Sequence, residues 1–288
     1  MSAVPGPSGP GDVEAPRAVV RRQARPGWVA IDFSELWHYR ELLGFYAVRD
    51  IKVRYKQTFL GAAWAVLQPV LTMVVFSIFF GRLAQVPSDD LPYPIFSFAA
   101  LLPWQLFSFA LTQSSNSLVD NAQVLTKVYF PRLVLPLAST LAGLVDFAIA
   151  FVVLIAMMLY FGIYPGWSVI ALPLLTVLAV LAALAVGLWL SALNVLYRDV
   201  RYAIPFLAQL WLFATPVAYS SSLVPDQWRA LYGLNPMVGV VEGFRWALLD
   251  ASKPPGAMLA VSVAATLAML IGGLFYFRRM EKTFADVI

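Results

Sequence analysis

The sequence predicts an all-α polytopic membrane protein, and three observations carry this prediction. Of the 288 residues, 60% are hydrophobic and only 12% are charged, whereas soluble domains carry about 25% charged residues. The mean hydropathy is +0.75. Several uncharged stretches reach the roughly 20 residues that a helix needs to cross the hydrocarbon of a bilayer. A soluble enzyme of this length is excluded, because it could not bury so much apolar surface.

Six apolar stretches are expected to cross the membrane within a membrane domain of residues 59–280. They are residues 60–80, 94–112, 133–161, 168–193, 203–220 and 257–277. The third is longer than a crossing needs, so it is expected to tilt, to kink near Pro136 or to begin outside the bilayer. The fifth is short. Because the number of crossings is even, both termini lie on one side of the membrane.

The segments outside the six stretches have distinct compositions. Residues 1–33 are rich in Pro, Gly, Ala and Arg, which is typical of a disordered tail. Residues 34–58 mix aromatic and basic residues and predict an interfacial amphipathic helix, the alternative being a plain soluble helix. The stretch 221–256 contains apolar runs too short to cross, which favours short external re-entrant helices. Residues 281–288 are expected to form a C-terminal tail.

The distribution of Lys and Arg gives the orientation. Most of them flank the six stretches on the side that also holds the two termini. Cytoplasmic loops carry such an excess, so the N- and C-termini are predicted to be cytoplasmic. The net charge of +4 therefore follows from topology, and no nucleic-acid partner is expected.

The residue types exclude most catalytic chemistry. The chain has no Cys and a single His, His38, which is expected at the membrane surface rather than in an active site. It also lacks a Walker-type phosphate loop and the H-E-x-x-H and G-x-S-x-G motifs. No catalytic residue, metal site or cofactor is expected in this chain, so the energy for any uphill transport must come from a partner or an ion gradient.

Asp146 is the one ionisable residue clearly inside a predicted span. Carriers coupled to protons or sodium ions need such groups in the membrane. On a helix, however, Asp146 shares a face with Ser139, Gly143 and Ala150, and small residues at this spacing favour close helix packing. A structural aspartate is the interpretation that we favour, and ion coupling remains a rival.

Two predicted spans carry faces that mix aromatic and amide side chains. Such faces suit a passage for sugars, because rings stack on pyranoses and amides bond to hydroxyl groups. The alternative is that the aromatic side chains face lipid, and periodicity does not decide between the two. The candidate channel-lining residues are Trp64, Gln68, Thr72, Phe76 and Phe79 in the first span and Phe206, Gln209 and Phe213 in the fifth.

Short motifs in a fixed order supply a resemblance to a known family. Residues 49–64, followed by Leu67-Gln68-Pro69, resemble the entry to the first span of the membrane subunits of ABC exporters for O-antigen, teichoic acid, capsule and related cell-surface polymers. Each piece is weak alone, but the order of the pieces along residues 34–280 is specific. The other agreeing pieces are residues 102–104, 127–132, 194–200, 215–217, 235–237 and 242–245.

The resemblance implies a non-enzymatic permease in the bacterial cytoplasmic (inner) membrane. It implies a homodimer bound to two copies of a cytoplasmic ABC ATPase, which holds ATP and Mg, and a lipid-linked polymer as substrate, usually carried on undecaprenyl diphosphate. The channel of the family maps onto the first and fifth spans, its interfacial helix onto residues 35–56 and its re-entrant helices onto residues 225–249. Its ATPase-coupling helix maps onto residues 117–127, here Ser117, Asp120, Asn121, Val124 and Lys127.

A run of cations precedes the first span, at the place where a diphosphate head group would arrive. Cations bind phosphate through charge-assisted hydrogen bonds. The alternative is that these residues anchor the chain to anionic lipid. They are Arg49, Lys52, Arg54 and Lys56. Rival functions are an ABC permease for a small drug or lipid, an ion-coupled carrier that uses Asp146, and a membrane enzyme acting on a prenyl-linked sugar. The enzyme is disfavoured because the sequence lacks paired carboxylates near one membrane face.

Overall fold

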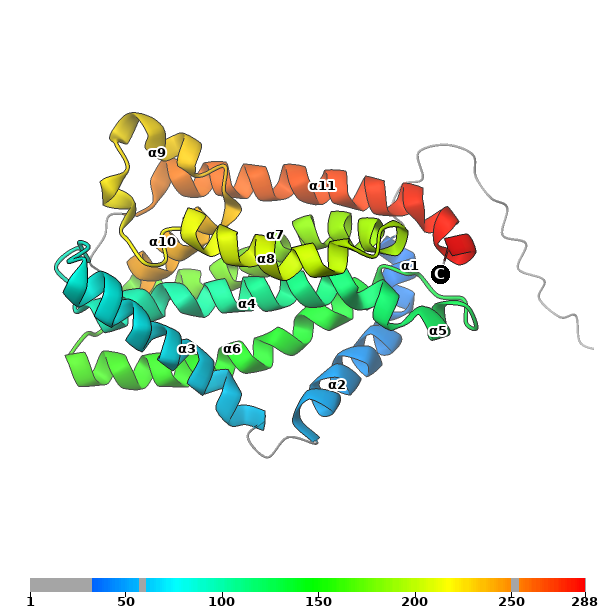
Figure 1. Cartoon of the computed structure of the whole chain (residues 1–288), viewed down its shortest axis with the longest axis horizontal. Coiled ribbons are helices and arrows are strands. Elements are labelled where there is room, and N and C mark those ends of the chain that lie inside the picture. The colour runs from blue at the N-terminus through cyan, green and yellow to red at the C-terminus, as the bar shows by residue number, and fades with distance from the viewer. Residues whose placement is uncertain (1–32, 57–60, 250–253, 288) are drawn as a thin grey trace, which may run out of the picture.

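The computed structural model describes residues 33–56, 61–249 and 254–287, and within them every regular element is a helix. The prediction of an all-α polytopic membrane protein is confirmed. Most of the long helices lie side by side along the longest axis of the molecule, and α3 crosses them obliquely (Figure 1). Three expected features fall outside the described residues. They are the tail of residues 1–33 except Phe33, the end of the interfacial segment at 57–58, and residue 60, where the first span was expected to begin.

Five helices are long and apolar enough to cross a membrane, and a sixth apolar helix is shorter. The sixth is α8 (Val200–Ala214), which corresponds to the expected short fifth span. It ends before the expected residue 220 because Thr215 is extended and Pro216 follows it. The five others are α3 (Gly61–Phe76), which a π-helix extends over Ser77–Leu83, α4 (Tyr93–Asp120), α6 (Val134–Phe161), α7 (Leu172–Leu196) and α11 (Gly256–Val287).

Two helices are longer than expected. α11 continues to Val287, so the residues expected to form the C-terminal tail are helical over most of their length. α4 continues past the expected end at residue 112 to Asp120, because its polar residues find partners in α7. The side-chain amide of Asn194 donates to the carbonyl oxygen of Ser115 and to Oδ1 of Asn116, each at 3.0 Å. A polar stretch with the composition of a loop therefore continues a buried helix.

α6 begins at Val134 and needs no kink at Pro136. This proline lies in the first turn, where backbone N–H groups have no partner within the helix, so it removes no hydrogen bond. At the other end, Gly162 adopts φ +67°, and its N–H bonds to the carbonyl oxygen of Leu159. Glycine is favoured there because this left-handed conformation strains other residues.

The segment expected to form an interfacial helix is helical, as α1 (Phe33–His38) and α2 (Arg40–Lys56), which Tyr39 separates. α2 lies at an angle to the long helices (Figure 1) and packs against α6. The expectation that it is amphipathic is wrong, because its charged and apolar residues are spread around the helix axis. The physical reason is that α2 turns both kinds inward: Tyr46 and Ala47 are buried, and Arg54 meets a carboxylate of α6.

Two short helices follow α8, as expected for the stretch before the last span. They are α9 (Asp226–Tyr232) and α10 (Pro236–Leu249). Nearly all of α10 is buried against α4, α7 and α11. A helix too short to cross a bilayer is tolerated at membrane depth when protein surrounds it, as here.

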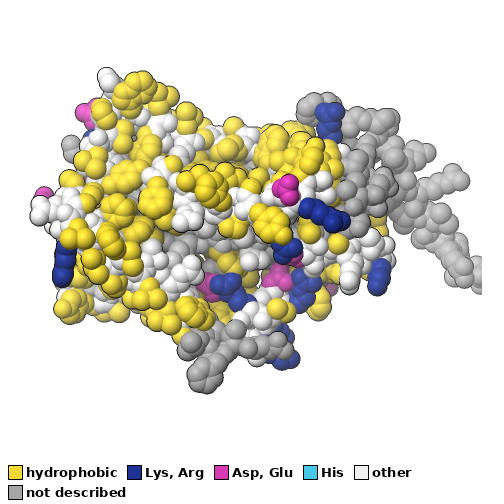
Figure 2. Space-filling view, viewed as in Figure 1, with side chains coloured by type: hydrophobic (Ala, Val, Ile, Leu, Met, Phe, Trp, Pro, Cys, Tyr) yellow, Lys and Arg dark blue, Asp and Glu magenta, His cyan; other side chains and the backbone are white. Residues whose placement is uncertain are grey.

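The surface agrees with a lipid environment for the long helices. In Figure 2, hydrophobic side chains cover much of the visible face, and most of the visible Lys and Arg side chains lie toward the end that carries the C-terminus. Large exposed hydrophobic side chains on α3, α6 and α8 include Leu71, Val152, Leu159 and Leu207.

Candidate functional site

A cavity of about 320 Å³ lies between α3, α4 and α6 and is partly open to the surroundings. α3 contributes Trp64, Gln68 and Thr72, which are three of the predicted channel residues. They share one side of the helix because they are separated by four and eight residues. The structure therefore brings these three together as the sequence predicted, although it places them opposite α4 and α6.

α4 supplies most of the uncharged polar lining, which the sequence analysis missed. These polar residues recur at helical spacing, so they form one stripe along a largely buried helix. They are Gln105, Ser108, Thr112 and Gln113, and Phe109 lies among them. This stripe was a signal in the sequence, because serine, threonine and glutamine recur at helical spacing in a stretch that is otherwise apolar.

An ion pair forms part of the cavity wall. Nη2 of Arg54 in α2 lies 2.5 Å from Oδ2 of Asp146 in α6, and both residues line the cavity. The hydroxyl group of Tyr55 donates to the other carboxylate oxygen. The guanidinium also lies 4.4 Å above the ring of Phe109. The end of α2 is thereby bound to both α4 and α6.

Tyr55 acts as a permanent hydrogen-bond donor in this group. Burial and the hydrogen bond to Asp146 raise the pKa of Tyr55 to about 12. Its hydroxyl is therefore protonated at physiological pH and always available to the carboxylate. Asp146 thus has a cation and a neutral donor as fixed partners, which is the arrangement of a structural carboxylate.

The other five predicted channel residues do not line this cavity. Phe76 is buried and packs edge to face on Phe80 at 5.3 Å, so it does not face an open space in this chain. Phe79 is exposed on the π-helix that follows. Phe206, Gln209 and Phe213 are exposed on α8 and lie outside the cavity, which α8 reaches only through Leu212. The aromatic faces of α3 and α8 therefore do not meet in one cavity of a single chain.

The predicted cations are not gathered into one cluster. Arg49 pairs with Asp50 at 2.8 Å and lies 4.6 Å above the ring of Tyr46, and Arg54 pairs with Asp146. Lys52 and Lys56 are exposed. A diphosphate that used the two arginines would have to compete with their carboxylates.

The predicted coupling segment spans the end of α4, Asn121 and a four-residue helix, α5 (Ala122–Leu125). Ser117 is buried, and its carbonyl oxygen accepts from the side-chain amide of Asn121 at 2.8 Å. Asp120 pairs with Arg201 of α8 at 3.2 Å. Val124 is half-buried in α5, and Lys127 is exposed. A second cavity of about 320 Å³ lies beside this segment, lined among others by Val119, Asn194, Arg198 and Arg201.

A buried arginine organises the opposite end of the molecule, and no sequence motif had assigned it a role. Arg245 of α10 is 3% exposed and lies 3.0 Å from Oε1 of Glu242. It also donates to the carbonyl oxygen of Val217 at 2.9 Å, and its guanidinium lies 3.6 Å from the centre of the Phe96 ring. α10 is thereby joined to α4 and to the segment after α8.

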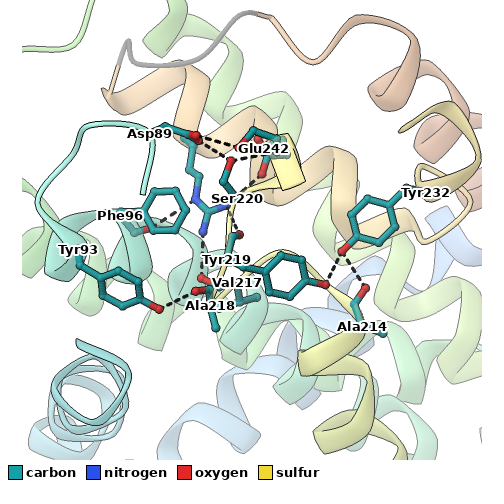
Figure 3. Close-up of polar contacts among 12 residues, drawn as sticks. Asp89, Tyr93, Phe96, Ala214, Val217, Ala218, Tyr219, Ser220, Tyr232 and Glu242 are labelled. Carbon is teal, nitrogen blue, oxygen red and sulfur yellow. Dashed lines mark hydrogen bonds and ion pairs between the residues drawn. The ribbon is translucent and has the colours of Figure 1, made fainter. Parts of the chain in front are cut away.

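Further hydrogen bonds bind the same segment, as Figure 3 shows. Tyr93 donates to the carbonyl oxygen of Ala218 at 2.6 Å, and Ser220 donates to Asp89 at 2.6 Å. The hydroxyl groups of Tyr219 and Tyr232 lie 2.7 Å apart. Burial and this contact raise the pKa of Tyr232 far above its usual range, so it remains a neutral donor. The chain beyond α8 is therefore held from several sides.

Comparison with known proteins decides the family. The family model described as ABC-2 type transporter matches residues 41–249, which is most of the chain. The chain belongs to the ABC-2 type transporter family. The matched range runs from α2 to the end of α10 and so includes the cavity, the predicted coupling segment and the Arg245 cluster.

Several relatives of this ABC-2 transporter chain match it over nearly their whole length. The O-antigen export system permease protein RfbA of Myxococcus xanthus is 31% identical over 257 residues, which are 88% of this chain and 98% of that protein. The protein of the same name from Klebsiella pneumoniae is 26% identical over 86% of this chain and 95% of its own length. The polysialic acid transport protein KpsM of Escherichia coli is 25% identical over 82% of this chain and 92% of its own length.

Proposed function

We propose that this chain is the permease subunit of an ATP-driven exporter that moves a lipid-linked cell-surface polysaccharide or polyol-phosphate polymer across the bacterial cytoplasmic membrane. The carrier would be of the undecaprenyl diphosphate type. The observation that carries the proposal is the match to an O-antigen export permease along 88% of this chain. The aromatic and amide side chains on α3 and α4 support the proposal, because rings can stack on sugars and amides can bond to their hydroxyl groups.

The energy would come from a partner. A cytoplasmic ABC ATPase, present in two copies and holding ATP and Mg, would contact the segment from Ser117 to Lys127. This segment supports the proposal because its last residues are exposed beside α5, while Asp120 connects it to α8 through Arg201. A push on α5 would thus reach a helix that carries predicted channel residues.

The passage itself would need two copies of the chain. The aromatic residues on α8 and Trp64 on α3 are exposed in one copy and do not share a cavity. A homodimer would bring such faces opposite each other. Many weak stacking contacts suit a polymer that slides, because one tight site would stall it.

The rival ion-coupled carrier lacks support from the site. Asp146 is bound to Arg54 and to the hydroxyl of Tyr55, so its charge is already compensated. Protonation of such a carboxylate would break an ion pair rather than fill an empty site.

The experiment that tests the function is depletion of the chain in its own cells, followed by extraction of carrier-linked glycans. We expect the polymer to be trapped on the cytoplasmic face while the cell surface is bare, and re-expression of the chain should restore the surface polymer. A normal surface without trapped polymer, in cells that carry no second exporter, would refute the proposal and favour a small drug or lipid as substrate.

A further inference from the structure

We propose that the cavity between α3, α4 and α6 is a binding subsite for one uncharged sugar unit. This inference rests on the proposed export function for the source of the sugar. It adds a site lined largely by α4 and α6, which neither the channel prediction nor the family match assigns. The argument depends on three features: unpaired amides, ring faces and the balance of charge.

The first feature is a set of side-chain amides without partners. Within the described part of the chain, the amide groups of Gln68, Gln105 and Gln113 make no hydrogen bond, and all three line the cavity. Gln105 and Gln113 are half-buried and Gln68 is exposed, so these amides are accessible to a ligand that enters the cavity. Each offers both donors and an acceptor, as the hydroxyl groups of a sugar require.

Two hydroxyl groups and one carbonyl group add acceptors. Thr72 and Thr112 each donate to a carbonyl oxygen of their own helix at 2.8 Å, so their oxygen lone pairs remain free to accept. Pro69 lies inside α3 and has no N–H, so the carbonyl group of Ala65, which lines the cavity, lacks its usual helical donor. The acceptors thus come from both α3 and α4.

The second feature is the presence of aromatic rings beside these polar groups. Trp64, Trp104 and Phe109 line the same cavity, and Trp64 presents an exposed ring. Trp104 is buried against Phe107, and the Arg54 guanidinium covers the ring of Phe109. Gly143 of α6 lets the ring of Phe109 approach, since a Cβ atom at Gly143 would lie 2.6 Å from Cδ1 of that ring. A pyranose has apolar C–H faces and an equatorial rim of hydroxyl groups, so rings and amides together match it.

The third feature is electrical neutrality. Arg54 and Asp146 are the charged residues that line the cavity, and they are paired at 2.5 Å. A phosphate or an acidic sugar would meet the Asp146 carboxylate, and a cation would meet the guanidinium. The cavity therefore favours an uncharged sugar, while the paired groups still offer hydrogen bonds. Its volume of about 320 Å³ lies in the range of small-molecule sites.

The test is site-specific photo-crosslinking in cells that produce the polymer, with the full chain and its partner ATPase. A benzophenone amino acid replaces Gln68 in the cavity or, as a matched control, Val74, which is exposed on the same helix and does not line it. The probe is the cell's own carrier-linked glycan, detected as hexose mass on the crosslinked peptide. We expect glycan at position 68 and lipid alone at position 74.

The other results would overturn the subsite. Phospholipid at both positions would mean that lipid fills the cavity, a crosslinked dimer would mean that a second copy covers it, and the absence of any adduct at position 68 would mean that it holds only water. As a second measurement, Gln105→Leu should lower the glycan crosslink from position 68 about tenfold, and an unchanged yield would contradict the inference.

Surface polymer, scored in the same cells, separates the two proposals. If the polymer reaches the surface through the benzophenone variant while position 68 crosslinks only lipid, the subsite is refuted and the export function stands. If depletion of the chain leaves the surface polymer unchanged, the export function itself fails.

Discussion

Individual charged residues inside the apolar bundle have specific partners. Asp146 meets Arg54 and Tyr55 at the cavity wall, and Arg245 meets Glu242, backbone carbonyl groups and the Phe96 ring elsewhere in the molecule. The sequence located Asp146 inside a span, but it could not identify the partners, because α2 and α6 are far apart along the chain. For the same reason it gave no role to Arg245.

The first residue-scale prediction concerns Arg245. Arg245→Met leaves the Glu242 carboxylate buried without its cation and should lower stability by about 3–5 kcal/mol. The melting temperature in detergent should fall clearly. The double variant Arg245→Met with Glu242→Met should recover part of the loss, because no charge is then left unpaired.

Arg229 provides the matched control for this experiment. Its ion pair with Asp226 is exposed, since the Asp226 side chain is 88% accessible. Arg229 also donates to the carbonyl oxygens of Val224 and Ser222. Arg229→Met should therefore cost about 1–2 kcal/mol, which is less than the cost of Arg245→Met. Equal effects of Arg245→Met and Arg229→Met would refute the role assigned to the buried pair.

The second residue-scale prediction separates the aromatic residues that the sequence grouped together. Trp64→Ala and Phe213→Ala remove exposed rings, so the protein should assemble normally while surface polymer decreases. Phe76→Ala empties a packed position and should cost about 3–5 kcal/mol. Immunoblots of membranes and a surface-polymer assay measure both effects. Normal surface polymer with Trp64→Ala and Phe213→Ala would contradict the channel hypothesis.

At the scale of elements, the sequence predicted which segments are helical better than it predicted where they end. The six apolar stretches correspond to α3, α4, α6, α7, α8 and α11, because hydropathy over 20 residues depends little on tertiary contacts. The end of α4 could not be predicted, since Ser115 and Asn116 are helical through contacts with Asn194 of α7. α2 was placed correctly, but its inward-facing Arg54 removes the expected amphipathic pattern.

The prediction at this scale concerns the contact between α4 and α8. Asp120→Arg replaces the carboxylate that lies 3.2 Å from Arg201 by a second cation and should weaken stimulation of the partner ATPase. Stability should change little, because both side chains are about half exposed. The exchange variant Asp120→Arg with Arg201→Asp should restore the stimulation. If both variants leave stimulated ATPase activity at the wild-type level, the pair has no part in coupling.

At the scale of the whole molecule, the candidate site was predicted in part. Trp64, Gln68 and Thr72 do share a cavity, but α8 supplies its aromatic residues to a different surface. Periodicity identifies the face of each helix and not the helix opposite, so the stripe from Gln105 to Gln113 was missed. The role of the exposed α8 face remains a prediction, since it depends on a second copy.

The central claim is that the chain exports a glycan at the expense of ATP on its partner. The most direct measurement uses inverted membrane vesicles that contain radiolabelled carrier-linked glycan and follows its protection from an added glycosidase. We predict protection that requires ATP and a functional ATPase and that is indifferent to an uncoupler. Protection without ATP that an uncoupler abolishes would contradict the account and establish ion coupling instead.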